Sequence, residues 1–271
     1  MKKFSIVINE LKDPKMKVTE RISSYLQNRG ASCVTVKDAQ DLTQEVECIL
    51  VLGGDGTMLQ AAGPAARKQI PMIGVNLGTL GYLAEIELDN LEEALEQLIQ
   101  DEYECDERIM LQGRIVGKDS ERELSPALND ISITRCGSLQ IISLKISVNG
   151  QFLCQWNADG IIISTPTGST GYNMSAGGPI VEPGANLIVL TPICAHTLNA
   201  RSIILKAEDS VEIEIDSGHN GSILQVEANS DGSERISMET GDKIFISKAE
   251  STTGIIKLSK VSFLEILHKK M

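Results

Sequence analysis

Aromatic side chains are scarce in this sequence, at 3% of its 271 residues with a single Trp. Aliphatic side chains must therefore supply most of the core, which a chain of this length is long enough to bury. Basic residues are fewer than acidic ones. The chain has 25 Lys and Arg and 37 Asp and Glu, which gives a net charge of −12. Such a chain is poorly suited to bind nucleic acid or an anionic membrane, so any phosphate site must be local.

The sequence also lacks long apolar runs and paired cysteines. The apolar stretch in MKKFSIVINE is five residues long, too short for a signal peptide or a membrane span. The six cysteines form no C-x-x-C pair, and His196 and His219 are not spaced as metal ligands. We therefore expect a reduced, cytoplasmic protein without a structural metal site.

Up to about residue 100, short apolar runs alternate with helical patterns. Strands are predicted at residues 4–8, 33–36, 48–52 and 72–75, and helices near 14–29, from about 57 to 67, and at 90–100. This order predicts an α/β domain with a doubly wound, Rossmann-like parallel sheet. Ligands of such sheets bind outside the carboxyl ends of the strands.

From about residue 108 the pattern changes to short alternating segments separated by Gly and Asn turns. Strands are predicted at residues 110–116, 128–134, 139–148, 161–164, 203–205, 211–215, 223–226 and 243–247. We expect an α/β domain at residues 1–107 and an all-β, sandwich-like domain at 108–255. Residues 256–271 are expected to return to the first domain, with 257–268 as a candidate final strand.

The segment ILVLGGDGTMLQAAG, residues 49–63, joins a buried strand to a helix through three glycines and one aspartate. Such a turn directs backbone N–H groups and the positive end of a helix at one point, and glycine lets a bulky phosphate approach. Asp55 would repel a phosphate, so it must serve something else. One interpretation is that it accepts a hydrogen bond from a hydroxyl that attacks the phosphate, or holds a metal ion. The alternative is an Asp-Gly turn whose carboxylate caps the next helix, although capping does not require three glycines.

Two segments of the second domain depart from ordinary β patterns. In ALNDISI, Asn129 and Asp130 interrupt an apolar run, for which an Asx turn is the alternative explanation. Residues 159–183, DGIIISTPTGSTGYNMSAGGPIVEP, are rich in hydroxyls and glycines, which can line a groove for a polar ligand or form a wide loop. Asn157 and Asp159 share a face if the chain is extended there. Within the segment, Tyr172 offers a flat ring to a base or to packing.

These motifs resemble those of the bacterial NAD kinases. The matching segments occur in the family's order and cover most of the chain: GGDGT at 53–57, GVNLGTLGYL at 74–83, the Asn-Asp pair at 129–130, residues 159–183, and LTPICAHTLNARSIIL at 190–205. GGDGT alone is shared with lipid kinases. The long glycine- and hydroxyl-rich segment is far more specific to NAD kinases.

The resemblance implies transfer of the γ-phosphate of ATP to the 2′-hydroxyl of the adenosine ribose of NAD, which gives NADP and ADP. It implies an active site in the cleft between the two domains, Mg²⁺ carried mainly by ATP, and a homodimer or homotetramer. Asp55 would be the catalytic group, and the phosphate-binding turn would consist of Gly53, Gly54, Gly56 and Thr57. NAD contacts would come from Asp55, Gly56, Asn129, Asp130, Asn157, Asp159, Thr170, Gly171, Tyr172 and Ser175.

The chain departs from the family pattern at three points. Gly171 stands where many members have alanine, the proline that commonly follows the residue matching Arg201 is missing, and Ser233 replaces a common glutamine. Two other functions are considered. A lipid kinase would need an apolar groove, which residues 159–183 are too polar to form. A dinucleotide sensor without turnover would gain nothing from Asp55.

Overall fold

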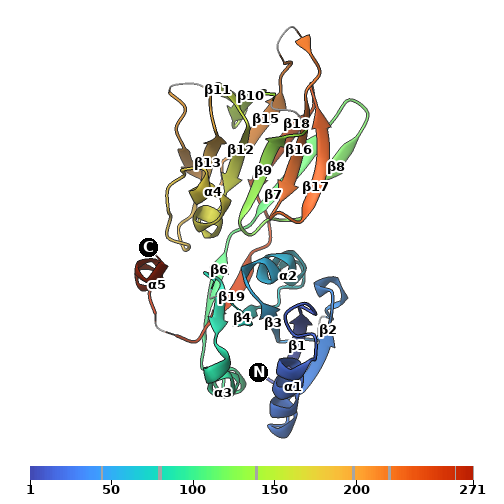
Figure 1. Ribbon diagram of the computed structural model, residues 1–271, viewed down its shortest axis with the longest axis vertical. Helices are drawn as coiled ribbons and strands as arrows, with labels where there is room; N and C mark the ends of the chain where they lie inside the picture. The colour runs from blue at the N-terminus through green and yellow to red at the C-terminus, as the bar shows by residue number, and fades with distance from the viewer. Residues whose placement is uncertain are drawn as a thin grey trace. The chain divides into compact units, whose positions relative to one another are not determined.

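The protein is described by a computed structural model that covers all residues except 44, 79–80, 138–139, 197–198, 219–220, 260 and 271, and the side chain of residue 269. The chain forms two compact units (Figure 1). Unit 1 comprises Met1–Arg108 and Ser251–Met271, and unit 2 comprises Ile109–Glu250. The chain therefore leaves unit 1, completes unit 2 and then returns.

Unit 1 is built on one sheet of mainly parallel strands. The strands are β1 (Lys3–Ile8), β2 (Ser32–Val36), β3 (Cys48–Gly53), β4 (Met72–Asn76), β5 (Ala84–Ile86), β6 (Glu104–Arg108) and β19 (Thr253–Lys257). Their order is β2-β1-β3-β4-β19-β6, with β5 also paired to β4. All pairs are parallel except β6 with β19. Every residue of β3 is buried, as expected for a strand covered on both faces.

Helices cover both faces of this sheet (Figure 1). The helices of unit 1 are α1 (Lys17–Asn28), α2 (Asp55–Lys68), α3 (Leu91–Ile99) and α5 (Phe263–Lys270), with short 3₁₀ turns η1 (Ala39–Asp41) and η2 (Leu88–Asn90). On one face, Ile22 of α1 and Leu95 of α3 share a core with Leu50 of β3. On the other face, α2 packs its buried alanines, among them Ala61 and Ala65, next to β3 and β19. The predicted doubly wound α/β architecture is confirmed.

The end of the chain differs from the prediction. The strand that rejoins the sheet of unit 1 is β19, at residues 253–257, and the predicted strand at 257–268 is wrong. Residues 263–270 instead form α5, in which Ile266 and Leu267 are half-buried and Leu264 is exposed. A short apolar run fits a helix as well as a strand, so its pattern alone could not decide between them.

Unit 2 is a sandwich of two antiparallel sheets. Its strands are β7 (Leu111–Val116), β8 (Glu121–Glu123), β9 (Asp130–Arg135), β10 (Ile142–Val148), β11 (Gln151–Ala158), β12 (Gly160–Ser164), β13 (Leu187–Ile193), β14 (Ile203–Lys206), β15 (Val211–Ile215), β16 (Gln225–Ser230), β17 (Glu234–Glu239) and β18 (Lys243–Lys248). One sheet has the order β11-β10-β15-β18-β7-β8, and the other β14-β13-β12-β9-β16-β17. Trp156 and Ile213 of the first share one buried cluster with Ile133 and Leu190 of the second, which confirms the predicted all-β domain.

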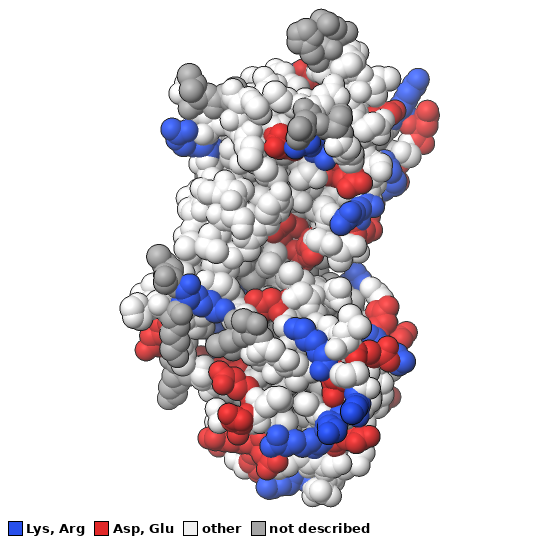
Figure 2. Space-filling view, in the orientation of Figure 1, with Lys and Arg blue, Asp and Glu red and all other residues white. Residues whose placement is uncertain are grey.

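Two elements and several surface features complete unit 2. The turn η3 (Thr167–Thr170) and the short helix α4 (Tyr172–Ser175) follow β12. On the face shown in Figure 2, charges of both signs crowd unit 1, whereas the region of unit 2 around α4 is almost uncharged. All six cysteines are free thiols. Among the described residues, no helix has the length and apolar character that a membrane span requires.

Candidate active site

Three loops of unit 1 meet at the carboxyl ends of the neighbouring strands β1, β3 and β4. They comprise residues 9–16, 53–57 and 77–83, of which 79 and 80 lie outside the described residues. The loops are joined by hydrogen bonds. Asn9 Nδ2 donates to Thr57 Oγ1 at 3.2 Å, and Leu77 N donates to Gly53 O at 3.1 Å. This edge is where an open α/β sheet binds its ligands.

In the glycine turn between β3 and α2, Gly53 and Gly54 lie close to side chains of other residues. A Cβ on Gly53 would lie 2.2 Å from Thr57 Oγ1, so a larger residue would break the turn. α2 begins at Asp55, and Thr57 N closes the turn on Gly54 O at 3.0 Å. The first N–H groups of a helix have no intrahelical acceptor, so this turn offers them to a ligand, as expected for a phosphate site.

The carboxylate of Asp55 binds the loop that follows β4. Its two oxygens accept hydrogen bonds from the backbone N–H of Tyr82 at 2.8 Å and of Leu83 at 3.1 Å. Gly81 makes this contact possible, because a Cβ there would lie 1.8 Å from Asp55 Oδ1. The carboxylate thus serves a neighbouring loop rather than its own helix, and the helix-cap alternative is wrong.

Lys12, which was not predicted from the sequence, brings a positive charge to the same turn. Its Nζ lies 2.9 Å from the position that a Cβ of Gly54 would take and 3.8 Å from the corresponding position at Gly78. The loop that carries Lys12 is anchored at both ends. Lys12 N donates to Asn9 O at 2.9 Å, and the buried carboxylate of Asp13 accepts from Thr19 N at 3.0 Å. The available signal was a lysine just after the first strand.

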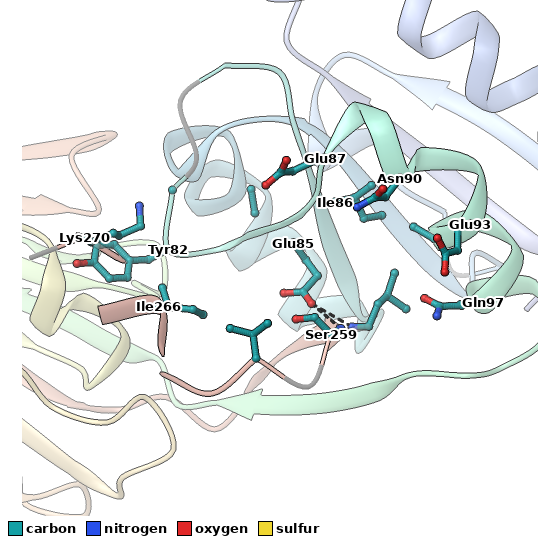
Figure 3. A pocket seen from close by; sticks show the side chains of 15 residues that line it. Tyr82, Glu85, Ile86, Glu87, Asn90, Glu93, Gln97, Ser259, Ile266 and Lys270 are labelled. Atoms are coloured by element: carbon teal, nitrogen blue, oxygen red, sulfur yellow. Dashed lines mark hydrogen bonds between the residues drawn. The ribbon is translucent and has the colours of Figure 1, made fainter. Parts of the chain in front are cut away.

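A separate pocket of about 700 Å³ lies beside the segment that holds Asp55 (Figure 3). Lys270 of α5 is at its rim, with Nζ 4.5 Å from the centre of the Tyr82 ring. Glu85, Glu87 and Glu93 line the pocket. Three carboxylates would repel a triphosphate, so this pocket does not suit the phosphate donor.

In unit 2, the chain around Asn129 packs directly on the glycine-rich segment. Asn129 O accepts from Thr165 N at 2.9 Å, and a Cβ on Gly168 would lie 2.1 Å from that same oxygen. A Cβ on Gly171 would lie 3.3 Å from Asn129 Nδ2, so an alanine here would fit only after a small shift. Asn129 Oδ1 is buried and has no hydrogen-bond partner among the described residues. A buried acceptor of this kind calls for a donor from a ligand or water.

The buried side chain of Asn173 holds the rest of this segment in place. Its Nδ2 donates to Ser169 O at 3.2 Å and to Pro179 O at 2.9 Å, while its Oδ1 accepts from Thr191 Oγ1 at 2.6 Å. All its hydrogen-bonding atoms are therefore used inside the protein. The segment contains β12, η3 and α4, and residues 176–183 have no regular structure.

Three further predicted residues belong to η3 and α4. Thr170 ends η3, and Tyr172 and Ser175 are the first and last residues of α4. Tyr172 is 44% exposed, and burial together with the charge of Asp130 raises the pKa of its hydroxyl. The structure thus brings Tyr172 close to the Asn129 and Asp130 pair.

Asn157 and Asp159 stand where the chain crosses from one sheet to the other. Asn157 is an exposed residue of β11, and its backbone oxygen accepts from His196 N at 2.8 Å. Asp159 lies between β11 and β12, and its Oδ1 forms an ion pair with Arg135 Nε at 3.1 Å. Asp159 is therefore fixed by a partner, Arg135, that was not predicted from the sequence.

Asp130 is the most unusual titratable group of this region. It begins β9 and is 7% exposed. Burial, and then the negative charge of Asp231, raise the pKa of Asp130 to about 7. Burial also raises the pKa of Asp231, to about 6, although three backbone N–H groups act against it. Both carboxyls therefore keep their protons to a higher pH than an exposed aspartate does.

This raised pKa predicts how the stability of unit 2 depends on pH. Protonated Asp130 is favoured in the folded state, so its stabilising contribution is complete below about pH 4 and is lost as pH rises through about 7. Relative to Asp130→Asn, the unfolding free energy of the wild type should fall by roughly 4 kcal/mol between those limits. Denaturant titrations followed by fluorescence of Trp156, the single Trp, report on unit 2. Parallel pH curves for the two proteins would contradict the raised pKa.

Sequence comparisons identify the same two parts of the chain. Residues 14–103 match the family model of the ATP-NAD kinase N-terminal domain, and residues 128–258 match that of the ATP-NAD kinase C-terminal domain. The NAD kinase of Lachnospira eligens is 43% identical over 293 residues, which covers 100% of both chains. The NAD kinase of Agathobacter rectalis is 44% identical over 282 residues and covers 100% of this chain and 99% of the relative.

Solved structures show the same fold. The crystal structure of yeast NADH kinase complexed with NADH superposes with a TM-score of 0.86 at 23% identity, over 99% of this chain and 87% of the yeast chain. An NAD kinase from Archaeoglobus fulgidus in complex with ATP gives a TM-score of 0.79 at 24% identity, over 96% and 95%. The full-length relatives above 40% identity confirm the resemblance found in the sequence, and the chain belongs to the NAD kinase family.

Proposed function

We propose that this chain transfers the γ-phosphate of ATP to the 2′-hydroxyl of the adenosine ribose of NAD, with Asp55 at the attacking hydroxyl. Membership of the NAD kinase family makes the chain a phosphotransferase. The observation that supports the residue assignment most is the placement of Asp55. Its carboxylate is held by Tyr82 N and Leu83 N beside the first turn of α2.

Asp55 has the capacity to orient a hydroxyl while it holds the loop. Each carboxylate oxygen accepts one backbone N–H and keeps a further lone pair. A ribose hydroxyl that donates to such a lone pair is aligned for attack on phosphorus. In a loose transition state the hydroxyl becomes acidic late, so a carboxylate can then take its proton.

We assign the triphosphate to the glycine turn and to Lys12. The turn consists of Gly53, Gly54, Gly56 and Thr57, and the positive end of α2 adds a favourable field there. The ammonium of Lys12 is next to this turn and would neutralise phosphate charge as a mobile point charge. Together they supply a local positive site on an acidic protein.

Reactions of this family with ATP generally need a divalent cation, and we propose Mg²⁺ carried by the triphosphate. The described residues contain no group of three His, Cys, Asp or Glu side chains able to hold an ion by themselves. On this proposal, the ligands of the cation are mainly phosphate oxygens and water. When bound, Mg²⁺ would neutralise charge on the transferred phosphoryl group.

We assign recognition of NAD to a group of residues in unit 2, with Asp55 and Gly56 contributing from unit 1. The unpaired Oδ1 of Asn129 suits an N–H or O–H donor of the dinucleotide. Asp159 would act together with Arg135, to which it is paired. The unit 2 set comprises Asn129, Asp130, Asn157, Asp159, Thr170, Gly171, Tyr172 and Ser175.

The assignment predicts that Asp55→Asn binds NAD but loses most of its rate, by at least about 100-fold, because the base is gone. The measurement is a coupled assay with Mg-ATP and NAD in which an NADP-specific dehydrogenase detects NADP. Calorimetry with NAD is the control for binding. Near-normal turnover would refute the role of Asp55, and a wild type that binds NAD without turnover would favour the sensor function.

Gly81→Ala tests the position of the same carboxylate without removing it. The added methyl would lie 1.8 Å from Asp55 Oδ1, so the carboxylate must move. Because misplacement by about 1 Å can cost about 100-fold, we expect kcat to fall at least about tenfold. Gly184→Ala is the matched control, since a Cβ there meets no atom within 4 Å. Equal kcat values for the two variants would contradict the prediction.

Lys12→Met should raise KM for ATP about tenfold, because it removes one charged contact with phosphate. KM for NAD should change less than about twofold on the same assignment. Lys15→Met is the control, as Lys15 is an exposed lysine of the same loop. Steady-state kinetics with each substrate varied in turn would test this. Equal KM values for ATP in both variants would exclude Lys12 from the phosphate site.

A further inference from the structure

A second aspartate, Asp231, controls the backbone that carries Asn129 and Asp130. It lies in the turn between β16 and β17, where Ser233 N donates to Ser230 O at 3.0 Å. Asp231 and Gly232 have φ of 49° and 69°, the left-handed pair that suits a tight hairpin. Because β16 pairs with β9, this turn stands beside the start of β9.

The carboxylate of Asp231 accepts three successive backbone N–H groups. The donors are Leu128 at 2.7 Å, Asn129 at 2.9 Å and Asp130 at 3.0 Å. In return, Asp231 N donates to Asp130 O at 3.1 Å. Successive N–H groups that converge on one anion form a nest, and hydrogen bonds to an ionised group are stronger than neutral ones.

The same stretch of backbone is held from its other side. Thr165 Oγ1 donates to Leu128 O at 2.6 Å, and Thr165 N donates to Asn129 O at 2.9 Å. The N–H groups are thus fixed by Asp231 and the carbonyls by Thr165. Only the side chains of Asn129 and Asp130 are then left to change conformation. Asn129 Oδ1 has no hydrogen-bond partner among the described residues.

We propose that Asp231 is a positioning residue for NAD binding: its carboxylate fixes the backbone of residues 128–130 so that Asn129 and Asp130 present their side chains to the dinucleotide. This rests on the proposed function, in which that pair contacts NAD. Asp231 itself does not touch the substrate. Its effect reaches the ligand through backbone conformation and through its charge.

The charge of Asp231 adds a dependence on pH that a purely structural turn would lack. Three elements surround Asp130: the β16–β17 turn places Asp231 beside it, α4 places Tyr172 near it, and β12 places the uncharged Ser164 opposite. Asp231 is one of the two causes that raise the pKa of Asp130. Without its charge, Asp130 would ionise at lower pH.

The test compares the full-length wild type with Asp231→Asn, whose side chain tolerates the left-handed backbone. We expect KM for NAD to rise at least about tenfold and KM for ATP to change less than about twofold. The acid limb of the pH profile of kcat/KM for NAD, where Asp130 ionises, should move to lower pH in the variant. The variant's kcat/KM should therefore fall further below the wild-type value at pH 8 than at pH 6. Asp231→Gly keeps the turn conformation and should show the same increase in KM.

Asp242→Asn is the matched control for a general loss of stability. Asp242 is also buried in a hairpin of unit 2, and its carboxylate accepts from Glu239 N at 3.0 Å. Thermal unfolding followed by Trp156 fluorescence should show that both variants lose a comparable amount of thermal stability. Only Asp242→Asn should keep the wild-type KM for NAD. Equal KM values in the two variants, or an unmoved acid limb in Asp231→Asn, would overturn the proposal.

Failure of the proposed function would be seen separately, as a wild type that makes no NADP. The same comparison is then made on the dissociation constant of NAD, measured by calorimetry. A larger dissociation constant for NAD in Asp231→Asn than in Asp242→Asn would support the positioning role even without turnover. Equal constants, or no NAD binding by the wild type, would overturn it.

Discussion

Close packing of Gly53 against the side chain of Thr57, at the end of β3, is the constraint on which the phosphate side of the site depends. Gly53 leaves no space for a Cβ beside Thr57, while its carbonyl receives Leu77 N from the loop after β4. Thr57 in turn receives Asn9 from the loop after β1. Three loops are thereby held within hydrogen-bond distance of one turn. Lys12 and Asp55 come together at this turn because the three loops that carry or hold them meet there.

Asp55 and Asp231 both accept backbone N–H groups with their carboxylates, but their proposed roles differ. Each carboxylate accepts backbone N–H groups from a segment far away in the chain, so each fixes the stretch of backbone at or just before the start of a strand. Asp55 accepts two N–H groups and keeps lone pairs for a substrate. Asp231 accepts three, which commits it to the protein, and its charge is then felt by Asp130.

Most strands that were predicted from the sequence have buried side chains in a regular pattern, although β13, with four consecutive buried residues, was not predicted. β3 and β12 are buried at every residue and were correctly predicted. β6, with the sequence ECDER, and β17, with ERISME, were missed because they are edge strands with largely exposed, charged side chains. An edge strand needs no apolar pattern, so its pairing leaves little trace in the sequence.

The residues of the candidate site also differ in whether the local sequence reveals them. Asn129 and Asp130 were found because they interrupt an apolar run, whereas Asp231 is 101 residues away from Asp130 and is brought near by the pairing of β16 with β9. The dipeptide Asp-Gly occurs at 55–56, 159–160 and 231–232. The first aspartate holds a loop, the second pairs with Arg135, and the third forms a nest, so one dipeptide has three roles. Local sequence predicts a turn in each case, and only the strand order determines which groups each carboxylate meets.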